Sequence, residues 1–172
     1  MKATALGRQD GFEAYKKALN FVALNYPQSE EGKQAEKIYA TVLPGLASKE
    51  FISEEEENSW KVVYKFEATE REESAALLEK LNEAISYFHY THMSISMDYY
   101  DPSTNFVIIH GLRSERGGRG FAEVLEEKKE FKIKRAFFEI SSSNYKVIQI
   151  HKNLEDYLTS TKMEEENSNP QN

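Results

Sequence analysis

The sequence predicts an α+β fold in two parts, a helical hairpin and a βαββαβ domain that carries an extra C-terminal helix. Three patterns support this prediction: apolar residues recur at helical spacing near the N-terminus, strand-like and helix-like runs follow one another after residue 60, and the period changes from strand to helix after Ser141. The expected divisions are the helical hairpin at 1–48, an acidic linker at 49–59, the α+β domain at 60–158 and a disordered tail at 159–172.

The N-terminal part predicts two antiparallel helices. Apolar residues from Phe12 to Ala23 recur on one helix face, and the pattern stops before Pro27, which disfavours helix at the preceding residue. Ser29 is expected to cap a second helix that runs to Gly45, with glutamates in its first turn. The apolar face of this hairpin is expected to stack on neighbouring repeats or, alternatively, to pack on the domain that follows.

The α+β domain is predicted from runs in which apolar residues alternate, as in strands, and runs in which they recur at helical spacing. The expected elements are a strand at 61–67, a helix capped by Thr69, strands at 95–99 and 106–110, a helix from Phe121 and a last strand at 136–140. This order is the split βαβ, ferredoxin-like arrangement, with both long helices on one face of an antiparallel sheet. The right-handed crossover rule places the first and third strands at the centre and the last strand at an edge beside the first.

A single closing helix is expected after the last strand. Val147, Ile150, Leu154 and Leu158 share one helix face, and Ser142 or Ser143 is expected to cap the helix. An isolated helix of this length is marginal in water, so Ile150 is expected to be a core residue.

Composition excludes several function classes. The chain of 172 residues has a formal net charge of −7, which disfavours nucleic acid as a partner, and no apolar run is long enough to predict direct membrane insertion. It has no cysteine, so disulfides, a thiol nucleophile and cysteine-ligated metals are excluded. The acidic blocks at 54–57 and 164–166 are assigned to the linker and the tail. No cofactor is predicted.

A glycine-rich turn offers the best candidate binding site. Glycine backbone and helix N-terminal amides can cradle an anion, and three arginines accompany them here. The candidate residues are Arg113, Arg116, Gly117, Gly118, Arg119 and Gly120. Their spacing matches neither a P-loop nor a dinucleotide fingerprint, and a solvated turn with surface arginines explains the same residues.

The histidines do not predict a metal or catalytic site. His89 and His92 lie three residues apart with Asp98 as a third possible ligand, but such a pair more often decorates a helix C-terminus. No Ser/His/Asp spacing predicts catalytic residues.

Aromatic residues exceed what a small core requires, so some are expected at the surface. Exposed aromatics are typical of protein interfaces, although they can instead fill a large core. Tyr99, Tyr100, Tyr145 and His151 are the candidate interaction surface.

Several runs resemble a known family. YPQSEEGKQAEKIY, IHGLRSERGGRGFAEVLEE and FFEISSSNYKVIQIHKNLEDYL resemble the C-terminal part of the tetratricopeptide-repeat lipoproteins of the type IX secretion and gliding motility machinery of Bacteroidetes, the SprE/PorW family. The resemblance implies a non-enzymatic scaffold module in the periplasm, anchored at the outer membrane by an N-terminal lipid on the parent protein and not in this chain. Its implied partners are components of the secretion translocon and motor, together with upstream tetratricopeptide repeats of the parent chain.

Two other functions remain open. One is a ferredoxin-like sensor domain that binds a small anion at the Arg113–Gly120 turn, and the more distant one is a hydrolase of unrecognised type. An acylphosphatase-type site would need a glycine-rich loop with arginine after the first strand, where this chain has the acidic run from Glu67 to Glu72.

Overall fold

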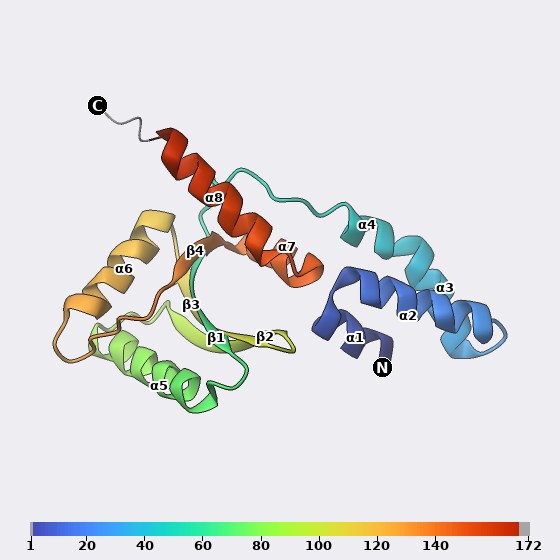
Figure 1. Cartoon of the computed structure of the whole chain (residues 1–172), viewed down its shortest axis with the longest axis horizontal. Helices are drawn as coiled ribbons and strands as arrows, with labels where there is room; N and C mark the ends of the chain where they lie inside the picture. Colours follow the sequence, from blue (N-terminus) through green and yellow to red (C-terminus); the bar gives the residue numbers. More distant parts are fainter. Residues whose placement is uncertain (1, 169–172) are drawn as a thin grey trace. The chain divides into compact units, whose positions relative to one another are not determined.

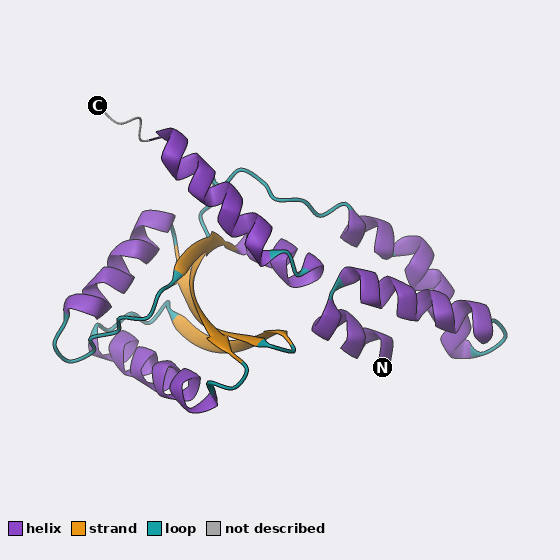
Figure 2. Cartoon of the chain, viewed as in Figure 1, coloured by secondary structure: helices purple, strands orange, loops and turns teal. Residues whose placement is uncertain are grey.

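A four-stranded antiparallel sheet occupies the middle of the chain, and helices occupy both ends (Figures 1 and 2). The computed structural model describes residues 2–168, which confirm the α+β prediction. The chain divides into two compact units, one formed by residues up to Phe51 together with those from Lys146, and the other by Ile52–Tyr145.

Helices of the first unit surround a small apolar cluster. The N-terminal helices are α1 (Lys2–Asp10), α2 (Phe12–Asn25), α3 (Glu30–Thr41) and α4 (Leu43–Ala47). The α2 and α3 helices form the predicted hairpin, and the Ser29 hydroxyl accepts a hydrogen bond from the Gly32 amide at 3.0 Å, as an N-cap does. Phe12, Leu19, Ala35 and Leu43 are the buried members of the cluster. Ile150, which was predicted to be a core residue of the α+β domain, is only half-buried and packs against the cluster of the helical unit instead.

The sheet of the second unit has the predicted topology. Its strands are β1 (Trp60–Glu67), β2 (Ser94–Asp101), β3 (Thr104–Leu112) and β4 (Phe138–Ser141), in the order β2-β3-β1-β4. Every neighbouring pair is antiparallel. The first and third strands are therefore central and the last strand lies at the edge beside the first, as expected for a ferredoxin-like βαββαβ arrangement.

Two helices, α5 (Arg71–Tyr87) and α6 (Glu115–Glu127), cover one face of this sheet (Figure 1). Val62, Tyr64 and Phe66 point from β1 into the core beneath them, because side chains alternate between the faces of a strand. Further buried members of this core are Trp60, Leu77, Leu81, Ala84, Val107, Ile109, Leu112, Phe121, Ala122, Leu125, Phe131 and Ile133.

The prediction of a glycine-rich turn followed by a helix from Phe121 is wrong. Helix α6 begins at Glu115, because the Ser114 hydroxyl accepts from the Gly117 amide at 3.1 Å and caps the helix six residues earlier than expected. Gly118 is buried against β1, and a Cβ atom there would lie 3.0 Å from Cγ2 of Val62. Glycine is used here for close helix–sheet approach rather than for a turn.

The cap of α5 also differs from the prediction. Glu70, and not Thr69, precedes the helix, and its Oε2 accepts from the Glu67 amide at 2.8 Å.

The predicted single closing helix is divided in two. Helix α7 (Ser142–His151) ends where Lys152 has a φ of 56°, and α8 (Leu154–Ser168) follows. The cap of α7 is Ser141, whose hydroxyl accepts from the Asn144 amide at 3.1 Å. Helix α8 extends beyond residue 159, where the disordered tail was predicted to begin, and residues 169–172 of that tail lie outside the described residues.

Two glycines of α6 give a matched test of this packing. A Cβ at Gly120 meets nothing within 4 Å, so Gly120→Val is expected to change the free energy of unfolding by less than about 0.5 kcal/mol, because valine has a slightly higher helix propensity than glycine. Gly118→Val is expected to lower it by about 1–3 kcal/mol, because the side chain would overpack against Val62. Denaturant unfolding followed by circular dichroism measures both, and equal effects at the two sites would contradict the close approach.

Candidate functional site

A polar cluster lies on the sheet face opposite α5 and α6. Lys61 and His110 alternate with Val62 and Ile109, which face those helices, so they point to the second face. The members of the polar cluster are Lys61 of β1, Ser96 and Asp98 of β2, His110 of β3 and Tyr145 in the first turn of α7. Most of them are half-buried, and Tyr145 is buried beside Phe106, with ring centroids 6.4 Å apart.

Hydrogen bonds join the polar cluster into one chain. Lys61 Nζ lies 3.1 Å from His110 Nδ1, and His110 Nε2 lies 2.8 Å from Ser96 Oγ. The Ser96 hydroxyl donates to Asp98 Oδ1 at 3.0 Å, and the Tyr145 hydroxyl donates to Asp98 Oδ2 at 2.8 Å. The carboxylate therefore receives two hydroxyl donors, and the chain connects β1, β3, β2 and α7.

The direction of these bonds fixes the proton on His110. A lysine ammonium can only donate, so Nδ1 of His110 accepts and Nε2 carries the hydrogen. The Nε2–H group then donates to Ser96, whose own hydrogen is used by Asp98. Burial lowers the pKa of His110 below its ordinary value, and the Lys61 ammonium lowers it further, whereas Asp98 opposes them. The imidazole is thus held neutral.

This arrangement does not activate a nucleophile. In a Ser/His/Asp triad the histidine accepts the serine proton and the carboxylate holds the histidine. Here the Ser96 hydroxyl donates to the Asp98 carboxylate instead of to the histidine, and Lys61 is bonded to the histidine nitrogen that a carboxylate would hold. What the polar cluster can do is hold three strands and α7 in register through charge-assisted hydrogen bonds.

Residues of the predicted anion-binding turn do not converge. Arg119 donates to Glu115 at 3.0 Å and to Glu139 at 2.9 Å, so its fork is used by two carboxylates. The Gly117 amide donates a hydrogen bond to the Ser114 hydroxyl, and Gly118 is buried against β1. Arg113 and Arg116 are exposed at the start of α6, and Gly120 lies within the helix.

The predicted interaction surface is divided between buried and exposed positions. Tyr99 is exposed on β2, but Tyr100 is buried and stacks on Phe106 with ring centroids 4.7 Å apart. Tyr100 and Tyr145 are therefore not surface residues, because alternation turns Tyr100 to the second sheet face. His151 belongs to the helical unit, where its ring lies 5.6 Å from that of Phe12.

No metal centre is formed in the part of the chain that the structure describes. His89 and His92 are exposed after α5, and no group of three or more histidine, aspartate and glutamate side chains within 2–168 could hold a metal ion. Within the same residues, no helix combines the length and apolarity that crossing a membrane requires.

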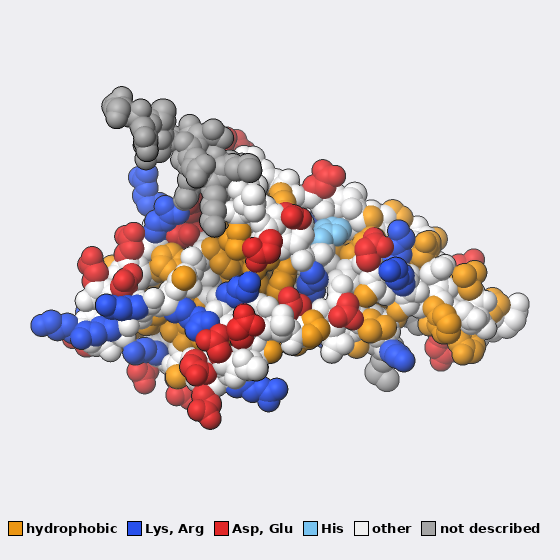
Figure 3. Space-filling view, in the orientation of Figure 1, with side chains coloured by type: hydrophobic (Ala, Val, Ile, Leu, Met, Phe, Trp, Pro, Cys, Tyr) orange, Lys and Arg blue, Asp and Glu red, His pale blue; other side chains and the backbone are white. Residues whose placement is uncertain are grey.

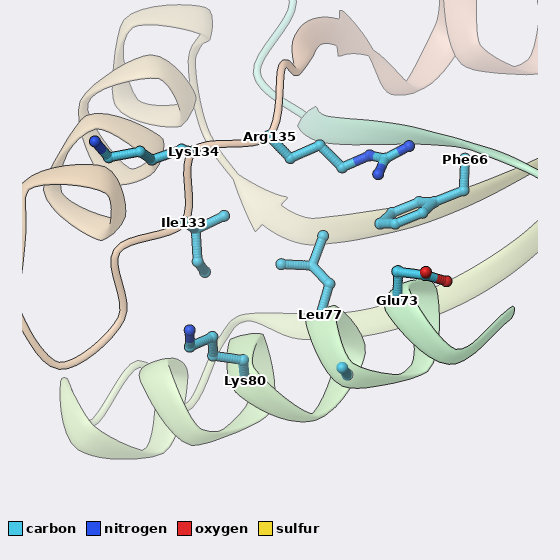
Figure 4. Close-up of a pocket in the computed structure, with 8 residues that line it drawn as sticks. Phe66, Glu73, Leu77, Lys80, Ile133, Lys134 and Arg135 are labelled. Carbon is cyan, nitrogen blue, oxygen red and sulfur yellow. The ribbon is translucent and has the colours of Figure 1, made fainter. Parts of the chain in front are cut away.

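A shallow groove lies between α5 and the segment that precedes β4 (Figure 4). It measures about 240 Å³, below the usual size of a ligand pocket, and is lined by Phe66, Glu73, Ala76, Leu77, Lys80, Ile133, Lys134 and Arg135. The Arg135 guanidinium lies 3.5 Å from the Phe66 ring centroid and is bidentate to Glu70, at 3.0 and 2.8 Å. Bonds from Arg135, and then from the Glu67 amide, lower the pKa of the Glu70 carboxyl. No sequence period marks Arg135, because it lies outside regular structure.

No protein-family model, curated protein or solved structure matches the chain. The fold and the candidate sites therefore rest on the residues described above.

The neutral state of His110 predicts a pH dependence of stability. An unfolded histidine has a pKa of about 6.5, and the folded value is lower, so below that pH the unfolded chain binds a proton that the folded chain does not. Stability should fall as the pH is lowered from about 7 to about 5. His110→Gln is expected to reduce this fall in melting temperature, whereas His92→Gln, at an exposed histidine, is not. Equal pH profiles for wild type and His110→Gln would contradict the prediction.

Specific anion binding at the α6 turn is not expected. Sulfate stabilises proteins generally because it is excluded from their surface. The sulfate-induced change in melting temperature must therefore be compared between wild type and a variant of the turn. Sulfate should raise the melting temperature of wild type and of Arg113→Ala/Arg116→Ala equally. A shift present in wild type and lost in the double variant would instead favour the anion-sensor function, because a ligand at one hundred times its Kd adds about 2.7 kcal/mol.

Proposed function

We propose that the chain is a non-enzymatic protein–protein interaction module of a periplasmic, outer-membrane-associated component of type IX secretion and gliding motility. The family resemblance of the runs quoted above supports the setting. Anchoring through an N-terminal lipid belongs to the parent protein in this proposal.

An exposed apolar end of the α2–α3 hairpin is the observation that carries the proposal. Phe21 is 58 % exposed, Leu24 is 70 % exposed and Tyr26, in the turn, is 56 % exposed. The rings of Phe21 and Tyr26 lie 6.4 Å apart, so these side chains form one patch rather than scattered positions. Figure 3 shows orange side chains gathered over the end of this hairpin. We call Phe21, Leu24 and Tyr26 the hairpin patch.

The hairpin patch fits another helical repeat as its partner. Helical repeats bury their apolar faces against neighbours, and clustered exposed apolar side chains mark protein interaction sites. Phe12 and Leu19, on the opposite side of α2, already pack within the unit, so the patch is additional to what the hairpin needs for its own core. We assign the patch to the upstream repeats of the parent chain first and to translocon or motor components second.

The internal bonding of the polar groups supports a non-enzymatic role. Ser96 and His110 are the one close serine–histidine pair of the polar cluster. His110 donates to Ser96, and Ser96 donates to Asp98, so the histidine does not accept the serine proton as a catalytic base would. Arg119, the arginine at the centre of the glycine-rich run, is paired with carboxylates.

Variants of the hairpin patch test the proposal. Phe21→Ser/Leu24→Ser in the intact parent protein is expected to weaken its repeat or translocon contact by about 2 kcal/mol or more, roughly thirtyfold, because central apolar anchors dominate interfaces. A photo-cross-linker at Tyr26, the member of the hairpin patch that the double variant keeps, should report contact with an upstream repeat or a secretion component in a gliding Bacteroidetes species.

Val124→Ser on α6, where the side chain is 43 % exposed, is the matched control and should leave secretion and cross-linking unchanged. The proposal is wrong if the double variant secretes and cross-links as wild type does while its melting temperature is also unchanged.

A further inference from the structure

A basic segment joins α6 to β4 in this otherwise acidic chain. Residues 128–135 read KKEFKIKR, with five lysines and arginines and one glutamate, whereas the whole chain has a net charge of −7. The Lys128 ammonium lies 4.3 Å from the Tyr87 ring centroid, and Arg135 is paired with Glu70. Three exposed ammonium groups have no hydrogen-bond or ion-pair partner among residues 2–168, those of Lys129, Lys132 and Lys134. The segment therefore offers positive charge to an acidic partner.

The groove of Figure 4 lies beside this segment and has an apolar middle. Its α5 wall is one helix face at i, i+3, i+4 and i+7, formed by Glu73, Ala76, Leu77 and Lys80. Its other wall is formed by Ile133, Lys134 and Arg135. Figure 4 shows the Leu77 and Ile133 side chains between Lys80 at one end and Arg135 with Phe66 at the other. Because Glu70 neutralises Arg135, the Lys80 end is the positive one.

Both walls of the groove are held in place by the fold. The Ile133 amide donates to the Leu125 carbonyl at 3.0 Å, which ties the segment to α6. The Arg135 Nε donates to the Lys65 carbonyl at 2.8 Å, which ties it to β1. The α5 wall belongs to a helix of 17 residues that packs on the sheet through Leu77. A preformed groove avoids much of the ordering cost of binding.

The size and charge of the groove select its occupant. A volume of about 240 Å³ suits one large side chain rather than a drug-sized ligand, for which roughly 300–1,000 Å³ is usual. Lys80 is half-buried, and its ammonium has no ion-pair partner in the part of the chain that the structure describes. A carboxylate there meets less competition from water than at a fully exposed lysine. The groove therefore suits an apolar side chain with an acidic neighbour at the Lys80 end.

The backbone beside the groove is also available. Residues 134–136 lie in neither helix nor strand, and within 2–168 they make no backbone–backbone hydrogen bond. The end of β4 differs, because its Ser141 amide donates to Glu54 Oε1 at 2.8 Å and this part of the sheet edge is covered by a side chain. Extended peptides pair with free backbone groups while alternate side chains enter pockets.

We propose that this groove binds an extended acidic segment of a partner protein, with one apolar side chain between Leu77 and Ile133 and a carboxylate at Lys80. A membrane surface is instead bound by apolar side chains that protrude. Nucleic-acid bases stack on exposed aromatic rings, whereas the Phe66 ring is buried beneath Arg135. The site lies in the α+β unit, so it does not depend on the hairpin patch.

Selection of short random peptides displayed on phage, with the intact chain as bait, supplies the probe. The enriched peptides should combine acidic residues with an apolar residue. Their affinity, measured by fluorescence polarisation, should fall as salt is added, because salt screens charges near the surface.

Two variants with matched controls locate the site. Lys80→Glu should weaken binding of the selected peptide roughly tenfold or more, whereas Lys37→Glu, the same change at an exposed lysine of α3, should not. Ala76→Leu fills the groove and should also weaken binding roughly tenfold, whereas Ala75→Leu, at an exposed neighbour that does not line the groove, should not. Phe21→Ser/Leu24→Ser should leave peptide binding unchanged, which distinguishes this site from the hairpin patch.

Several outcomes would overturn the proposal. These are no enrichment over a selection on Ala76→Leu/Lys80→Glu, enriched peptides without acidic residues, or equal loss of binding in the variants and their controls. Phosphatidylglycerol vesicles or a single-stranded oligonucleotide that bind as tightly as the peptide, and equally well to Ala76→Leu, would instead assign the basic segment to a membrane or to a nucleic acid.

Discussion

Burial of β1 on both faces is the constraint on which the α+β unit depends. Val62, Val63, Tyr64 and Phe66 are all buried, and β1 pairs with β3 on one side and β4 on the other. The backbone amide and carbonyl groups of a strand in this position find hydrogen-bond partners only on its two neighbours. Burial of β1 therefore requires both β3 and β4. The close approach of α6 at Gly118 completes the cover of one face, and Tyr145 and Phe106 contribute to the cover of the other.

Alternation and element order were sufficient to predict this sheet. The alternation of Val62, Tyr64 and Phe66 predicts that they share one face of a strand, and the crossover rule places β1 and β3 at the centre of the sheet. Local rules failed where tertiary contacts decide. The glycines at the start of α6 predict a turn from their residue type alone, whereas the role of Gly118 depends on Val62, which is more than 50 residues away in the sequence. The left-handed backbone of Lys152 likewise has no pattern that marks it, since it is neither glycine nor asparagine.

The polar cluster could not be predicted as a site, because its members come from four elements. One signal was present in the sequence. Ser96 and Asp98 occupy every second position of β2 together with Tyr100, which is buried, so two polar residues share a face with an aromatic core residue. Buried polar groups require partners, and that pattern indicates a hydrogen-bonded network on this face. Tyr100 and Tyr145 were expected at the surface and are buried, because aromatic content alone does not say which face of an element carries a residue, whereas Tyr99 is exposed as expected.

The hydrogen bond from the Ser141 amide to Glu54 bears on where the α+β unit begins. The stretch before β1 is also bonded at three places to the first turn of α7, which directly follows β4: through Asn144 to both backbone groups of Ile52, through Ser143 to Glu57 and through Ser142 to Ser59. A fragment cut at Trp60 would retain all four strands but lose the side chains that cover its last edge. The smallest piece that keeps this edge in its native condition starts at Ile52, so the glutamates are part of the folded unit rather than a spacer that precedes it.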